Sequence, residues 1–198
     1  CKTMAPPSDP KLLASLLDRC RHGDGDAFQR IFDLFRGPIY SYLARTTGDR
    51  HLAEDLLQDT FLRMIQNLDR YQESGRFQAW LFRIAANRVR DWARRKSHSE
   101  RVGGAADPDD PDSTGAVDRP VDAPPEAQME QSEEVRLLEA AVAGLEYEER
   151  QVLILRHYSD LSFKEIANIM NAPLGTVLAR SHRALAKLRQ RMAEAPDG

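Results

Sequence analysis

The chain has 198 residues, of which 41% are hydrophobic and 30% charged, and its formal net charge is −3. A chain of this size can bury the core of one or two domains, but it contains no run of the roughly 20 apolar residues that cross a bilayer. Because two cysteines exclude a disulfide framework or a zinc site, and residues 1–10 lack an apolar signal region, we expect a cytoplasmic protein without membrane insertion.

Four helices are predicted in the first half, because apolar residues recur there every three or four positions. They start near Leu12 and near Asp26, and the third and fourth cover about residues 52–68 and 78–96. Gly37 and Pro38 lie within the second helix and predict a bend or a division of it, since proline cannot donate the helical hydrogen bond. Residues 71–77 are predicted to form a loop.

A proline-rich acidic segment separates the two halves of the chain. Residues 104–131 contain five prolines and almost no large apolar side chains, so they cannot bury enough surface to offset the entropy of ordering. Between residues 102 and 134 there are ten acids and one base, a local net charge of −9. We interpret the segment as a flexible linker, because about 28 extended residues reach about 95 Å and can join two bodies bound at separate places.

Four further helices are predicted after this linker. Apolar residues indicate helices over about 135–145 and 148–157, and Ser162 with Glu165 matches the S-x-x-E capping box that starts a third. Residues 171–173 break it, and an amphipathic helix over 174–192 follows. A short helix, a three-residue turn and a basic helix form the layout of a DNA-binding helix-turn-helix.

The last predicted helix carries a basic stripe. Thr176, Arg180, Arg183 and Lys187 stand at offsets of 0, 4, 7 and 11, which places them on one helical face. Val177, Ser181, Ala184 and Leu188 occupy a second stripe that is expected to face the core. Arginine can hold guanine through two acceptors in the major groove, and lysine can pair with phosphate. The pattern favours DNA binding over the alternative, an αα-hairpin with a charged outer face.

Basic residues also concentrate in the fourth predicted helix. Residues 76–101 hold eight bases and two acids, a local net charge of +6, and residues 174–192 hold five bases and no acid. Two basic blocks separated by an acidic one indicate a polyanionic partner, although solvated helix faces would give the same count.

These observations predict an all-α fold of two small helical domains, an N-terminal bundle and a C-terminal helix-turn-helix domain, joined by a flexible, acidic, Pro-rich linker. We expect an N-terminal extension with the start of the first helix over 1–19, the first domain over 20–101, the linker over 102–131 and the second domain over 132–194.

Short strings in both domains carry a family resemblance, which covers about residues 20–100 and 132–192. The strings are GDAF (25–28), AEDLLQDTF (53–61), FQAWLFRIAAN (77–87), LEYEERQVLIL (145–155), SFKEIA (162–167) and PLGTV (173–177). In this order and at this separation they resemble a bacterial extracytoplasmic-function (ECF) RNA polymerase sigma factor. The resemblance implies a promoter-specificity subunit without catalytic activity or cofactor. Such a subunit binds core RNA polymerase, recognises the minus-ten and minus-35 elements and helps to open the promoter.

In this family the third helix docks on a coiled coil of the largest polymerase subunits. The resemblance implies that the polar residues of that helix bind core polymerase; they are Glu54, Asp55, Gln58 and Asp59. Leu56 and Leu57 are expected to face the core. Carboxylates that meet a basic coiled coil orient the encounter and accelerate it. The alternative is that the acids only solubilise the helix and favour its N-terminal dipole.

The resemblance also implies two DNA contacts, one with melted and one with duplex promoter DNA. At the minus-ten element, basic, aromatic and amide groups hold the single non-template strand; the residues are Tyr71, Ser74, Arg76, Arg83, Asn87 and Arg88. Asn87 matches the family's base-contacting asparagine, whereas Trp80 and Trp92 are expected in the core. At the duplex minus-35 element the contacts are Thr176, Arg180, Arg183 and Lys187.

The family pattern changes at one place in the last helix. After residues 175–177 the family often has a basic residue and then serine, but this chain has Leu178 and Ala179. The pattern therefore does not predict which bases the helix contacts, and Leu178 could touch a thymine methyl group or a partner protein.

Family members are commonly held inactive by an anti-sigma factor wedged between the two domains, so such a partner is possible here. We expect the free protein to be monomeric. The acidic linker either imitates nucleic acid in a polymerase channel or serves as a solubilising spacer. The alternative function is that of a stand-alone helix-turn-helix transcriptional regulator, which would leave the docking helix and the melting loop without a role.

Overall fold

The computed structural model describes residues 10–101, 133–159 and 161–194. In these ranges the chain is helical and contains no strand, which confirms the predicted all-α class. The expected linker over 102–131 and the first nine residues lie outside the described residues.

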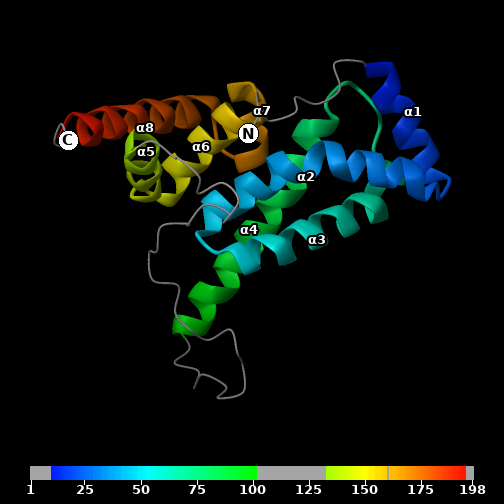
Figure 1. The fold of residues 1–198 in the computed structure, drawn as a ribbon, viewed down its shortest axis with the longest axis horizontal. Helices are drawn as coiled ribbons and strands as arrows, with labels where there is room; N and C mark the ends of the chain where they lie inside the picture. Colours follow the sequence, from blue (N-terminus) through cyan, green and yellow to red (C-terminus); the bar gives the residue numbers. More distant parts are fainter. Residues whose placement is uncertain (1–9, 102–132, 160, 195–198) are drawn as a thin grey trace.

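The helices fall into two groups along the chain. The first group is α1 (Pro10–Arg21), α2 (Gly25–Thr47), α3 (Arg50–Asn67), the 3-10 turn η1 (Leu68–Arg70) and α4 (Phe77–Arg101). The second group is α5 (Glu133–Ala143), α6 (Tyr147–Tyr158), α7 (Phe163–Met170) and α8 (Leu174–Glu194). Figure 1 shows the second group seated at one end of α2, with α1 at its other end.

The boundaries of α2 follow from its capping residues. The Asp24 side chain accepts hydrogen bonds from the backbone N–H groups of Asp26 and Ala27, and Gly48 ends the helix in the left-handed region at φ 73°. Between them the helix continues through Pro38, so the expected division of this helix is wrong. Pro38 is buried, and α2 packs against α1, α3, α4 and α6, which offsets the roughly 3 kcal/mol that an interior proline costs.

The helix-turn-helix forms as the sequence predicts. The Ser162 hydroxyl accepts from the backbone N–H of Glu165, whose carboxylate accepts from the backbone N–H of Ser162, so the capping box is complete. Asn171 ends α7 in the left-handed conformation at φ 51°, with its N–H bonded to carbonyls of α7. Val177, Ser181 and Ala184 are buried, which confirms the predicted inner stripe of α8.

The apolar core runs through both groups of helices. Ile31, Phe35 and Tyr42 of α2 belong to the same buried cluster as Ile154 of α6 and Ile166 of α7. A smaller cluster joins Leu145, Leu153 and Ala184. The two halves of the chain therefore pack against each other, with α6 on α2 and α7 on α4.

Candidate functional site

A basic pocket lies between α3 and α4. Its volume is about 370 Å³, and it is lined by Arg63, Asn67, Arg70, Trp80, Arg83, Ile84, Asn87 and Arg88. Four of these residues are arginines and none is acidic. The volume falls in the range of about 300–1,000 Å³ that small ligands occupy. An indole face beside cationic donors suits an unstacked base with its phosphate.

Two carboxylates hold two of the four pocket arginines, Arg63 and Arg88. Asp59 accepts hydrogen bonds from Nε of Arg63 at 3.1 and 3.2 Å and lies 3.6 Å from Nη1 of Arg88. Asp91 pairs with Nη2 of Arg88. These ion pairs orient the guanidinium groups before any ligand arrives. They also occupy Asp59, one of the four residues assigned to core polymerase.

The amide of Asn87 is oriented by its neighbour Arg90. Nη1 of Arg90 donates to Oδ1 of Asn87 at 2.7 Å. A guanidinium has donors only, so the amide oxygen must face Arg90 and the Nδ2 group is the donor that Asn87 can offer to a base. Nη2 of the same Arg90 donates to the backbone oxygen of Ile169 in α7 at 3.2 Å. Arg90 therefore connects the pocket to the helix-turn-helix.

The loop over residues 71–76 is anchored at its first residue. Tyr71 is buried, and its ring centroid lies 4.6 Å from that of Trp80 and 5.5 Å from that of Phe77. Nη2 of Arg21 donates to the Tyr71 carbonyl at 2.7 Å. Burial, and after it the Glu73 carboxylate, raises the pKa of the Tyr71 hydroxyl to about 12. A DNA contact by Tyr71 stays a prediction that its burial does not favour.

The remaining minus-ten residues are better placed for a ligand. Ser74, Arg76 and Arg83 are exposed, and Arg83 lines the basic pocket with Asn87 and Arg88. Ser74 and Arg76 lie in the loop and outside the pocket lining. Trp80 was expected in the core. Its ring packs against Tyr71 and Phe77, but the side chain is only half-buried and also lines the pocket.

The outer face of α3 combines acidic and apolar groups. Glu54, Asp55 and Gln58 are exposed, as the docking assignment requires, and Leu62 and Ile65 on the same face are 54% and 45% exposed. At about 100° per residue, these five side chains occupy an arc of about 100°. We call them the α3 face. Its polar residues lie nearer the start of α3 and its apolar residues nearer the end, so the face offers a partner both charged groups and apolar area to bury.

The basic stripe of α8 meets acidic residues of α6. Arg180 pairs with Glu148, and its side chain is only 16% exposed. Arg183 and Lys187 both reach Glu149, at 3.3 and 2.8 Å. Thr176, at the start of the stripe, is half-buried. The predicted basic face of α8 is present, but its cations are paired with carboxylates of α6 that lie more than 30 residues earlier in the chain.

Glu149 is the buried member of this ion-pair cluster, with 5% of its side chain exposed. Burial alone would raise the pKa of its carboxyl group, but hydrogen bonds from Lys187 and Arg183 outweigh this effect and lower it. The bond to Glu149 in turn raises the pKa of Lys187. Both shifts favour the charged forms of Glu149 and Lys187, so their ion pair helps to fix the cationic edge of α8.

Sequence reasoning missed three residues of the basic pocket. Arg63, Asn67 and Arg70 stand at offsets of 0, 4 and 7, the spacing of one helical face. This signal was available, because the spacing of the three polar residues can be seen in the sequence. Arg90 was counted only as a positive charge, and its partners could not be inferred from its position.

Metal-ligand clusters and membrane-spanning helices are both absent from the described residues. Within them, no set of three or more His, Cys, Asp or Glu side chains is grouped so as to hold a metal ion. No helix in the described ranges has the length and apolar character needed to cross a membrane.

Two family models match the chain, one in each half. They are Sigma-70 region 2, over residues 31–99, and Sigma-70 region 4, over residues 141–190. The chain is 33% identical over 178 residues to the RNA polymerase sigma factor CarQ of Myxococcus xanthus, which covers 90% of this chain and 96% of CarQ. It is 28% identical over 190 residues to the ECF RNA polymerase sigma factor SigW of Bacillus subtilis, covering 92% and 98%.

Two solved structures share the fold. One is the sigma factor RpoE crystallised with the anti-sigma factor NepR from Bartonella quintana, with a TM-score of 0.66, 23% identity and coverage of 85% of this chain and 98% of that one. The other is CnrH in complex with the cytosolic domain of CnrY, with a TM-score of 0.63, 22% identity and coverage of 95% and 100%.

Replacement of Glu149 by Gln tests the ion-pair cluster. The variant leaves Arg183 and Lys187 without their shared anion, so we expect the free energy of unfolding at pH 7 to fall by about 1–2 kcal/mol in urea titration. A carboxyl group whose pKa is lowered on folding stabilises the protein above its ordinary pKa of 4.5 and loses this effect as the pH falls. The difference from the wild type should therefore shrink below pH 4.5.

Glu148→Gln is the matched control, because Glu148 is exposed and pairs with Arg180 alone. Surface ion pairs contribute little, so this variant should change the unfolding free energy by less than about 0.5 kcal/mol. Equal losses in both variants would contradict the role given to Glu149.

Proposed function

Because this chain belongs to the extracytoplasmic-function sigma factors of bacterial RNA polymerase, we propose that its α3 face, basic pocket and helix-turn-helix perform the three contacts of promoter-directed initiation. The chain binds core RNA polymerase, directs it to promoters and aids their opening. It acts as an initiation factor, and we propose that it has no catalytic activity of its own. The observation that carries the residue assignments is the basic pocket between α3 and α4, with Asn87 oriented inside it.

We propose that the α3 face docks on core polymerase. Exposed Glu54, Asp55 and Gln58 offer anionic and polar groups, and Leu62 and Ile65 add apolar area that a partner can bury. Charge complementarity would accelerate the encounter, while burial of Leu62 and Ile65 would supply affinity. Asp59 has a different part in this proposal, because its ion pairs with Arg63 and Arg88 hold the edge of the pocket.

The basic pocket receives a base of the melted non-template strand. Trp80 provides a stacking wall, Asn87 donates from Nδ2, and Arg83 and Arg88 neutralise the adjoining phosphates. Aromatic stacking and cationic grooves are the means by which proteins hold unpaired strands. The loop residues Ser74 and Arg76 lie outside the pocket, and we assign them contacts with the part of the DNA strand that leads into it.

The helix-turn-helix contacts duplex DNA at the minus-35 element. Arg183, 59% exposed, is the stripe residue with the most accessible charge, whereas Arg180 must leave Glu148 to reach a base. We therefore assign the first phosphate or base contacts to Arg183 and Lys187. Thr176 and Arg180, at the start of the helix, are assigned contacts that form once DNA displaces the Arg180–Glu148 ion pair. An anti-sigma factor is a further proposed partner, and the cytoplasm the proposed location.

Reconstitution with core enzyme tests the function as a whole. The purified full chain, added to bacterial core RNA polymerase on a library of randomised promoter templates, should produce transcripts that enrich two conserved elements. The measurement is sequencing of the selected templates. If the chain neither binds nor stimulates core polymerases from several bacteria, it is not a sigma factor.

Asp55→Arg tests the α3 face. Asp55 is exposed and pairs with nothing that the fold requires, so circular dichroism should be unchanged, while affinity for core polymerase should fall at least about tenfold through charge reversal. Asp33→Arg makes the same charge change at an exposed position of α2, where Asp33 pairs only with exposed Arg36, and it should retain wild-type affinity. Equal binding by both variants would remove the α3 face from the docking surface.

Asn87→Ala tests the pocket. Loss of one base contact of about 1–3 kcal/mol should weaken holoenzyme binding to a template with an exposed non-template strand by roughly 5- to 150-fold. Templates that each lack one base of that strand supply the control. On the template that lacks the base contacted by Asn87, wild type and variant should bind equally, because the contact is already missing. A constant difference at every abasic position would show that Asn87 contacts no base.

A further inference from the structure

The basic stripe of α8 contains two kinds of cation. Arg183 and Lys187 pair with the buried Glu149, while their own side chains are 59% and 40% exposed, so both cations stay accessible in the ion pair. Arg180 is the reverse case. Its side chain is 16% exposed, whereas that of its partner Glu148 is 57% exposed. A ligand that approaches this end of the stripe therefore meets the carboxylate of Glu148 more readily than the guanidinium that it holds.

The two kinds of cation would meet DNA differently. Phosphates repeat along any duplex, so Arg183 and Lys187 can bind them at every base sequence. Arg180 must first leave Glu148, and a phosphate taken in exchange would lie close to the released carboxylate, where like charges repel. A guanine edge in the major groove instead offers the two acceptors O6 and N7 without a net charge. The exchange at Arg180 is therefore more favourable with such a base than with a phosphate.

The pair of Glu148 and Arg180 has little structural work to do. The fold of α8 is supported from its inner stripe, where Val177, Ser181 and Ala184 are buried. Glu148 is exposed, and an exposed carboxylate in a surface ion pair adds little to stability. A function for the pair is therefore better sought in what the cation can bind than in what holds the helix in place.

We propose that Glu148 is a specificity-determining residue of the helix-turn-helix, which withholds Arg180 from phosphates and releases it to a base that offers two acceptors. The proposal rests on the proposed function of α8 and deepens it. Arg183 and Lys187 supply affinity for any duplex, and the exchange at Arg180 supplies selectivity. Specificity is a difference between two affinities, and a repulsive element that acts against the wrong partner increases it.

Glu148→Gln tests this role in the reconstituted holoenzyme. Equilibrium binding is measured at one salt concentration on two templates, a promoter selected in the reconstitution experiment and the same promoter with its minus-35 element scrambled. The variant should bind the scrambled template about 5- to 10-fold more tightly than the wild type does, because Arg180 becomes available to phosphates. Affinity for the intact promoter should rise at most about twofold, so the ratio of the two affinities should fall about threefold or more.

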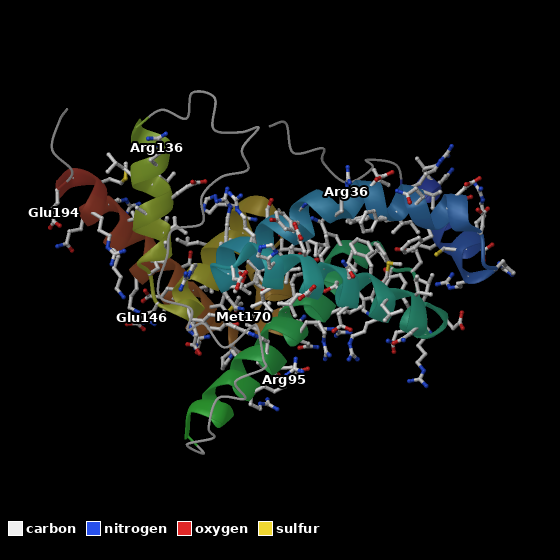
Figure 2. The ribbon with its side chains drawn as sticks, turned by 60° about the horizontal axis from the view of Figure 1, so that its bottom comes forward. Arg36, Arg95, Arg136, Glu146, Met170 and Glu194 are labelled. Atoms are coloured by element: carbon white, nitrogen blue, oxygen red, sulfur yellow. The ribbon has the colours of Figure 1, made fainter. Side chains whose placement is uncertain are left out.

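Glu146→Gln is the matched control for the loss of one negative charge. Glu146 is exposed, lies where α5 meets α6 in Figure 2, and has its carboxylate 3.7 Å from Nζ of Lys187. This variant leaves the pair of Arg180 and Glu148 intact, so it should raise the affinity for both templates by the same factor and leave their ratio unchanged. An equal fall of the ratio in both variants would show an effect of net charge alone and would overturn the proposal.

A double-variant cycle connects the effect to Arg180. In Arg180→Ala there is no cation to withhold, so the further change Glu148→Gln should alter the affinity for both templates by the same factor. Arg180→Ala by itself should remove the preference for one base pair of the minus-35 element. If Glu148→Gln still lowers the ratio in the absence of Arg180, the carboxylate acts through another residue and the proposal is wrong.

Chemical labelling of the free full-length chain gives a readout without polymerase or DNA. Phenylglyoxal modifies accessible arginines, and mass spectrometry of the peptides reports each site. Arg180 should react more slowly than Arg183 in the wild type, and Glu148→Gln should accelerate the labelling of Arg180 but not that of Arg183. Equal rates at the two arginines in the wild type would show that Glu148 does not withhold Arg180, and would overturn the proposal.

The binding data separate failure of this inference from failure of the proposed function. A wild-type holoenzyme that prefers the intact promoter, combined with an unchanged ratio in Glu148→Gln, would overturn the role of Glu148 alone. A wild-type holoenzyme that binds both templates equally would overturn the proposed minus-35 contact, and the role of Glu148 with it.

Discussion

Burial of α4 is the constraint on which both proposed functions of the first half depend. Its inner face packs with α2 through Leu81, Phe82 and Ala85, which are all fully buried. Small side chains at Ala85 and Ala86 allow neighbouring helices to approach closely. One side of α4 then closes the basic pocket with α3, and another seats α7. The same helix therefore positions both the pocket and the contact with the helix-turn-helix.

Ion pairs give the cationic surfaces their geometry. Asp59 holds Arg63 and Arg88 at the pocket, and Glu149 holds Arg183 and Lys187 at α8. A cation fixed in this way loses less conformational entropy when it meets phosphate. Under the proposed function, DNA would displace or share these carboxylates, and its binding would exchange ion-pair partners. Net charge along the sequence shows the cations but not this exchange.

Much of the fold could be derived from local pattern. The helices of the second half begin and end close to their predicted positions because the capping box at Ser162 and the breaker at residues 171–173 act on their own backbone. The division of α2 at Pro38 was wrong for the opposite reason, since the packing that allows the helix to continue past this proline comes from other helices. The pocket was half predicted. The residues of α4 were identified, but Arg63 and Asn67 of α3 and Arg70 of η1 were not assigned a role.

The sequence by itself determined the helical class, the helix-turn-helix and the family, because caps, turns and apolar periodicity act over a few neighbouring residues. Only the tertiary structure decided which cations are paired, that Tyr71 is an anchor, and that the halves meet. The hydrogen bond between Tyr42 and Gln151 spans 109 positions. Such a contact depends on how whole helix faces fit together, and no local pattern specifies it.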